Sequence, residues 1–220
     1  EYLMKLIYET NSDISICDPL HCYPEENIVF EEEKFHKVFS ADEAVKEMLY
    51  QKSFLVSACA KIYRKEYFDN IKFVGMLFED SATIYKIFEC ADRIVYGDAK
   101  LYGYMHRENS ITTKKFSKAD CDILYICDEI VAYMDRKKDH DLIAASLAYQ
   151  MSAAFRIYLN APRNNQFNDE IKKSEDIIKT NSYKVLLDKN VRRKAKIAII
   201  MFACSKKMMI KVYKHVDRWK

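Results

Sequence analysis

The chain has 220 residues, 50% of them hydrophobic, and a formal net charge of +3. A chain of this size and composition can bury the core of one globular domain with an appended subdomain. It is therefore not itself a disordered tail. Only three Gly and three Pro occur, so a turn-rich all-β sandwich is excluded and helices are expected to dominate.

The seven cysteines lie at irregular positions, and no two of them form a Cys-x-x-Cys pair. This usage is typical of reduced thiols in a cytosolic protein rather than of a disulfide framework. The first residues do not read as a signal peptide, and the longest uninterrupted apolar run, Ile197 to Cys204, is far shorter than the ~20 residues that span a bilayer. We therefore expect a cytoplasmic location, which extends to the inner face of the cell membrane if the C-terminal segment binds lipid.

The N-terminal half predicts alternating helices and strands. Leu3, Leu6 and Ile7 follow a helical spacing, and the β-branched segment 13–17 alternates as a strand does. Ser40 and Glu43 form a capping box, which predicts a helix that ends near Gln51.

Further along, extended structure is expected over residues 54–63, and a second amphipathic helix is expected to begin at Glu79-Asp80. Two short strands, 93–96 and 101–104, are predicted to be joined through Gly97-Asp98.

From Phe116 onward the pattern changes, because only helical periodicity follows. Four helices are predicted, over residues 117–137, 141–160, 167–188 and 190–218. The change at 113–117 predicts two parts: an α/β region over residues 1–115 and an all-α helical subdomain over residues 116–220, with helices dominant overall.

Adjacent carboxylates, Glu79 and Asp80, stand at the start of the second predicted helix. Acidic residues are favoured there by the unpaired amides and the helix dipole, which explains the pair without any chemistry. A carboxylate at the mouth of a cleft is also a suitable general base. The pair by itself leaves both interpretations open.

Two further segments carry polar and charged side chains that are each typical of ordinary surface. They are Ser57-Ala58-Cys59-Ala60-Lys61-Ile62-Tyr63-Arg64 and Tyr102-Gly103-Tyr104-Met105-His106-Arg107-Glu108-Asn109-Ser110-Ile111. Their order around Glu79-Asp80 is the informative feature.

In this order the three segments resemble the C-terminal halves of bacterial family 2, GT-A-type glycosyltransferases, which build capsular, exopolysaccharide and cell-wall glycans. That family shows Lys-aliphatic-Tyr with basic residues, then an aromatic residue with Glu-Asp, then Tyr-x-Tyr-x-x-Arg-x-x-Ser-Ile. The resemblance covers residues 1–115 and implies a partial GT-A-like region on the acceptor side of the enzyme. It also implies a nucleotide-sugar donor and a glycan or lipid-linked acceptor.

The resemblance assigns roles to five residues. Asp80 would be the base of an inverting displacement at the anomeric carbon, and Glu79 would support it or contact the acceptor. Arg107 and His106 would stabilise the leaving diphosphate, and Lys61 would help line the same cleft. His106 is also the residue that would reach a divalent cation, Mg or Mn, expected in the full-length enzyme.

One departure from the family is large, because the half with the metal-binding Asp-x-Asp ahead of Glu1 is absent. We therefore expect a truncated or partial chain that is inactive alone and binds no cation of its own. A literal Asp-x-Asp, Asp139-His140-Asp141, falls between two predicted helices and is interpreted as a helix cap. Cys17, His21 and Cys22 lack a fourth ligand for structural zinc, so buried thiols are favoured.

The C-terminal end is strongly basic. Residues 191–220 contain ten Lys or Arg and one Asp, a local charge of +9 that leaves −6 for the rest. The basic residues alternate with apolar ones, which predicts a helix that either lies on an anionic membrane or packs on the helical subdomain with a charged outer face. Nucleic acid is not expected as a partner, because no binding motif accompanies the charge.

The sequence thus leaves two functions open. The first is a family 2-like glycosyltransferase, and the alternative is a non-catalytic helical adaptor that binds a membrane or protein partner through residues 117–220. They differ over Asp80, which should face a cleft shared with Arg107 in the enzyme and, in the adaptor, should merely cap its helix at a distance from any pocket.

Overall fold

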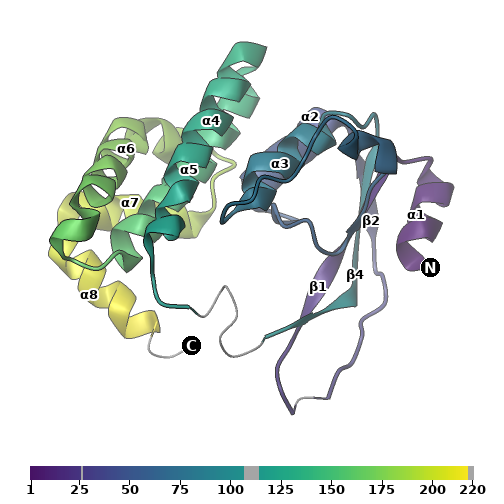
Figure 1. Ribbon diagram of the computed structural model, residues 1–220, viewed down its shortest axis with the longest axis horizontal. Helices are drawn as coiled ribbons and strands as arrows, with labels where there is room; N and C mark the ends of the chain where they lie inside the picture. Colours follow the sequence, from purple (N-terminus) through teal and green to yellow (C-terminus); the bar gives the residue numbers. More distant parts are fainter. Residues whose placement is uncertain (26, 107–113, 218–220) are drawn as a thin grey trace. The chain divides into compact units, whose positions relative to one another are not determined.

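The computed structural model describes residues 1–25, 27–106 and 114–217 (Figure 1). The chain divides into two compact units, Glu1–Lys115 and Phe116–Lys220. In the described residues, the first unit combines a four-stranded mixed sheet with helices, and the second is built from helices. The predicted fold class, an α/β region followed by an all-α region with helices dominant, is confirmed.

The sheet has the strand order β2-β4-β1-β3. Its strands are β1 (Ile14–Cys22), β2 (His36–Phe39), β3 (Lys61–Ile62) and β4 (Ile94–Met105). The central strands β1 and β4 run parallel, and the outer strands are antiparallel to their neighbours. Both central strands begin with fully buried aliphatic residues, as expected for strands covered on two faces.

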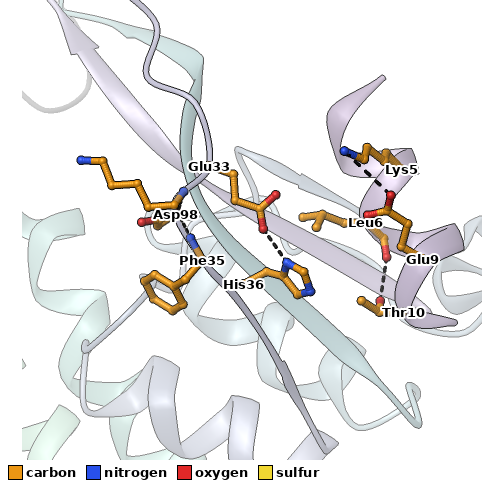
Figure 2. A network of polar contacts seen from close by, with 9 residues as sticks. Lys5, Leu6, Glu9, Thr10, Glu33, Phe35, His36 and Asp98 are labelled. Atoms are coloured by element: carbon orange, nitrogen blue, oxygen red, sulfur yellow. Dashed lines mark hydrogen bonds and ion pairs between the residues drawn. The ribbon is translucent and has the colours of Figure 1, made fainter.

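β4 corrects one prediction, because it is a single strand where two short strands joined at Gly97-Asp98 were expected. Cys17 of β1 is paired with Gly97, but its neighbour Asp18 is paired with Lys100. β4 therefore accommodates its turn-like residues as an irregularity within the ladder rather than as a turn. The Asp98 carboxylate accepts hydrogen bonds from the amides of Lys34 and Phe35 at 2.8 and 3.0 Å (Figure 2).

Gly97 lies where α1 (Tyr2–Thr10) packs on the sheet. A Cβ atom at this position would lie 1.9 Å from the Tyr2 hydroxyl oxygen and 3.1 Å from Leu6 Cδ1. Leu6 is fully buried, and its carbonyl accepts a hydrogen bond of 2.6 Å from the Thr10 hydroxyl (Figure 2). A side chain at position 97 would therefore require the Tyr2 side chain to move or the helix to shift.

On the other face of the sheet, α2 (Ala41–Leu49) and α3 (Glu79–Phe88) lie side by side (Figure 1). The predicted capping box of α2 is confirmed, with Ser40 and Glu43 each bonding the other's amide. Phe54 joins this layer to the sheet, since its ring lies 6.0 Å from Phe88 and 5.6 Å from Tyr96. α3 is thus anchored in the core from its second turn onward.

The second unit packs its helices around α5. Its main helices are α4 (Asp122–Lys137), α5 (His140–Asn160), α6 (Asn168–Leu187), α7 (Arg193–Cys204) and α8 (Lys206–Asp217). α5 contacts α4, α6 and α7. Asp139 accepts hydrogen bonds from the amides of Asp141 and Leu142 at 2.8 and 3.1 Å, so the prediction that Asp139-His140-Asp141 caps a helix is confirmed.

The prediction of one C-terminal helix over 190–218 is wrong. Ser205, with φ −162° and ψ 108°, separates α7 from α8. Its hydroxyl accepts a hydrogen bond of 3.3 Å from the amide of Met208. Ser205 therefore starts a new helix with its side chain, which competes with continuing the old one.

One helix in the described residues, α5, is long and apolar enough to cross a membrane, judged by length and composition. Of its apolar window, 72% is buried inside the protein. The buried core helix of a helical bundle has the same composition, so this property is weak evidence for a membrane span.

Candidate functional site

Asp80 lies in the first turn of α3, two residues after a backbone conformation that bulky residues rarely adopt. Phe78, the residue before the helix, has φ 66° and ψ 30°, in the left-handed region. Such a conformation costs on the order of 1–3 kcal/mol, persists only where the surrounding structure fixes it, and is common at functional sites. Glu79 and Asp80 follow this strained residue as the first two residues of α3.

The side chain of Asp80 is held by a distant loop. Its Oδ2 accepts a hydrogen bond of 3.0 Å from the backbone N–H of Ala58. In the described part of the chain, its Oδ1 accepts none. Burial raises the pKa of Asp80, the neighbouring Glu79 charge raises it further, and the Ala58 amide and the Lys61 charge oppose the shift. Asp80 is therefore a half-buried carboxylate with raised proton affinity and one oxygen available to a substrate.

The loop 55–60 replaces the extended segment that the sequence predicted over residues 54–63. Only Lys61–Ile62 forms a strand, and Ala60 before it has a left-handed φ of 59°. The Ala60 carbonyl accepts a hydrogen bond of 2.9 Å from the amide of Cys17, which ties the loop to β1. The loop thus rests on the sheet at one end and on Asp80 in the middle.

Lys61 holds the same loop from inside. Its ammonium donates to the carbonyl oxygens of Leu55, Ser57 and Cys59, at 3.2, 2.5 and 3.4 Å. These three contacts use all the donors that an ammonium has. Burial lowers the pKa of Lys61 to about 8, against the attraction of the Asp80 charge. The structure therefore places Lys61 in the support of the loop, whereas the sequence suggested that it lines a diphosphate cleft.

Tyr63 bonds the other backbone polar group of Ala58. Its hydroxyl donates to the Ala58 carbonyl at 3.4 Å, and burial raises the pKa of Tyr63. Both polar groups of Ala58 are therefore bonded to side chains, one to Tyr63 and the other to Asp80. Sequence reasoning missed this role of Ala58, because no residue type signals a functional backbone amide.

The third segment reaches the loop through Tyr102 of β4. The neighbouring Cys59 side chain raises the pKa of Tyr102. All three sequence segments that carry the resemblance therefore meet at the loop 57–60. Cys59 of this loop interacts with Tyr102, Ala58 bonds Asp80, and the loop leads into Lys61.

His106 follows β4 and lies in an aromatic cluster. Its Nε2 is 2.9 Å from Nδ1 of His21, and its ring stacks on Tyr23 with 4.5 Å between centroids. Tyr104 packs against it edge-on at 5.3 Å. His21 was considered only with Cys17 and Cys22 as zinc ligands, yet parallel pairing of β1 and β4 places it opposite Tyr104.

A cation site is not complete in the described residues, where no group of three or more His, Cys, Asp or Glu side chains could hold a metal. His21 and His106 offer two imidazole nitrogens, and Mg²⁺ prefers oxygen ligands. The two histidines alone do not fit such a cation, so we assign it no step in the chemistry below. Arg107, Ser110 and Ile111 lie outside the described residues.

No protein-family model and no curated protein matches the sequence. Among solved structures, the chain is similar to the crystal structure of S. aureus TarS 1-349 in complex with UDP-GlcNAc, with a TM-score of 0.55 and 16% sequence identity. The match covers 98% of this chain and 62% of that chain, so this chain spans less than two thirds of its structural relative. At this identity the likeness concerns the fold: the chain has a glycosyltransferase-like fold.

Proposed function

We propose that this chain is the acceptor-side part of an inverting, family 2-like glycosyltransferase. The observation that carries the proposal is the hydrogen bond from Ala58 to Asp80. It joins two of the three sequence segments that carry the resemblance at a half-buried carboxylate. The glycosyltransferase-like fold supports it. A nucleotide sugar is the proposed donor, which the UDP-GlcNAc of the structural relative supports.

In the proposed reaction, Asp80 Oδ1 accepts the proton of an acceptor hydroxyl while that oxygen attacks the anomeric carbon of the donor. A new C–O bond forms as the bond to the diphosphate breaks on the opposite face, which inverts the configuration. The proton remains on Asp80, whose raised pKa favours this state. Glu79 assists because its charge raises the proton affinity of Asp80.

For the leaving group we propose His106 and Arg107. His106 lies at the end of β4, the strand that also carries Tyr102, and Arg107 follows it in the sequence. A guanidinium offers paired donors to phosphate oxygens, and an imidazole supplies one more donor. The donor half that would supply a Mg or Mn site is proposed to lie in another part of the full-length enzyme, which makes this chain inactive alone.

For the acceptor we propose a glycan or lipid-linked glycan, used in the synthesis of cell-surface polysaccharide. The segment that leads into Asp80 exposes three apolar side chains, Phe73, Val74 and Met76, at 41%, 44% and 38%. Exposed apolar residues beside a proposed acceptor site support an acceptor with an apolar part. A cytoplasmic location is proposed as well, and the seven free cysteines fit it.

The adaptor alternative is less well supported. It requires Asp80 to serve its own helix, whereas the Asp80 side chain accepts its hydrogen bond from Ala58, 22 residues away. No comparable observation in the described residues favours a purely structural role for the Ala58–Asp80 contact.

The test is donor turnover by the natural full-length protein, with Asp80→Asn compared with wild type. Asn keeps the shape and can still accept the Ala58 hydrogen bond, but it cannot take the proton. We expect turnover to fall by about two orders of magnitude or more, with donor binding retained. The matched control is Asp92→Asn, an exposed carboxylate outside the site, which should retain wild-type turnover. Near-normal turnover by Asp80→Asn would reject Asp80 as the base.

A further inference from the structure

The exposed side of α7 combines basic and apolar side chains. Arg193, Ile197 and Ile200 recur every three or four residues, which places them on one side of the helix. Ile197 and Ile200 are 55% and 53% exposed, while Ile199 and Phe202 are buried in the core of the unit. α7 therefore has an apolar inner side and a second apolar stripe that faces outward.

α8 repeats this arrangement. Met209 is buried, whereas Met208 and Val212 are 49% and 43% exposed. Lys207 and Lys211 are exposed and stand one position before each of them. One side of α8 thus anchors the helix, and the other presents two cations beside two apolar side chains.

We define the basic-apolar face as eight of the exposed residues of these two helices, namely Arg193, Lys194, Ile197, Ile200, Lys207, Met208, Lys211 and Val212. In the part of the chain that the structure describes, none of the four cations of this face forms an ion pair. The neighbouring Lys206, by contrast, pairs with Glu175. The face therefore presents uncompensated positive charge.

We propose that the basic-apolar face binds an anionic lipid surface. Cations attract the negatively charged headgroups, and the exposed Ile, Met and Val side chains enter the boundary between headgroups and acyl chains. A nucleic acid would neutralise the cations equally well, but its phosphate backbone offers nothing to four exposed aliphatic side chains. The combination of both features favours a lipid surface.

The sequence left packing and membrane contact open as alternatives, and in the structure the two are compatible because they would use different sides of the helices. The helices pack through Ile199, Phe202 and Met209, and the opposite sides remain exposed. Binding through these sides would leave the fold unchanged and requires no sugar transfer, so the proposal stands or falls independently of the proposed reaction.

The experiment is flotation of the 220-residue chain with vesicles of phosphatidylcholine alone or mixed with phosphatidylglycerol. We expect binding to the mixed vesicles and little to the neutral ones. Lys207→Glu with Lys211→Glu should weaken binding at least about tenfold, because each lysine near an anionic surface contributes several-fold. Ile197→Ser with Ile200→Ser should also weaken it at least about tenfold, since both side chains lose their apolar contact.

The controls lie on α6 of the same unit. Lys172→Glu with Lys184→Glu makes the same change in net charge, and Tyr183→Ser with Leu187→Ser removes side chains that are 74% and 66% exposed. Both pairs should bind within about twofold of wild type, with circular dichroism reporting folding of every variant.

Three outcomes would overturn the proposal. The first is that the wild-type chain does not bind anionic vesicles. The second is that the control variants lose as much binding as the test variants, and the third is that the Ile197→Ser, Ile200→Ser variant binds as well as wild type. Displacement from the vesicles by a short DNA duplex that binds more tightly would assign the face to nucleic acid instead.

Discussion

The backbone N–H of Ala58 donates a hydrogen bond of 3.0 Å to Oδ2 of Asp80, although 22 residues separate them. An acidic residue that only stabilised its own helix would interact with the amides of the first turn. The link instead couples the carboxylate to a loop that Lys61 and Tyr63 also hold. Asp80 is thus fixed by tertiary contacts, and four predictions follow from these contacts and from two others.

Asp80→Asn should stabilise the protein at neutral pH. The folded-state pKa of Asp80 is raised, so the folded protein binds the proton more tightly, and stability falls as the pH rises from 3.8 through the raised value. Removing the charge should raise the free energy of unfolding at pH 7 by on the order of 0.5 kcal/mol after solvent screening. Urea unfolding would measure it, and the gain should vanish below pH 3.8, where wild-type Asp80 is protonated in both states. A destabilised Asn variant at pH 7 would contradict this.

Lys61→Met should act on both stability and catalysis. Three carbonyls lose a charged donor, which should lower the free energy of unfolding by about 1–3 kcal/mol. Because the Lys61 charge lowers the pKa of Asp80, its loss should move the acidic limb of the turnover profile of the full-length protein to higher pH. Lys65→Met, an exposed lysine in the same segment, is the control. A lower rate with an unmoved pH profile would mean that Lys61 supports the fold without influencing the base.

Gly97→Ala should be destabilising by about 1–3 kcal/mol, because the added methyl group would lie 1.9 Å from the Tyr2 hydroxyl oxygen. Gly75→Ala is a matched control, since its Cβ would meet nothing within 4 Å. No described glycine has a positive φ, so the difference would report packing alone. Thermal or urea unfolding of both variants would measure it, and equal stability would show that the Tyr2 side chain or α1 can move at little cost.

Lys118→Met should weaken the helical unit at neutral pH. Lys118 pairs with Glu170, whose side chain is 6% exposed, and this contact lowers the pKa of Glu170. Loss of the partner should lower the free energy of unfolding, but only modestly, since Lys118 itself is largely exposed.

The pH dependence has a definite sign. Because the folded-state pKa of Glu170 is lowered, its contribution is present above 4.5 and is lost as the pH falls through the lowered value. Unfolding of wild type and Lys118→Met should therefore converge at acid pH. Adding Glu170→Gln to Lys118→Met should restore part of the loss at neutral pH, and no recovery would mean that the buried charge is not the cause.

Part of the fold could be predicted because its signals are local. The Ser40-Glu43 capping box, the Asp139 cap and the strand at residue 14 depend on side chains and neighbours in sequence, and the structure contains all three. The change in periodicity near residue 116 is local as well, and the structure divides the chain between Lys115 and Phe116. The order of the three segments also pointed to Glu79 and Asp80, whose catalytic role stays a prediction.

The features of the fold that the sequence did not predict depend on contacts between residues distant in the chain. Gly97-Asp98 has the composition of a turn, but pairing with β1 and packing of Tyr2 keep it within a strand. Residues 54–63 have the composition of a strand, but the ammonium of Lys61 satisfies the carbonyls of a loop instead. The sequence by itself determined which residue types could do the chemistry and in what order they occur. Only the tertiary structure decided that Ala58 meets Asp80, because a backbone amide looks the same in every sequence until folding places it beside its partner.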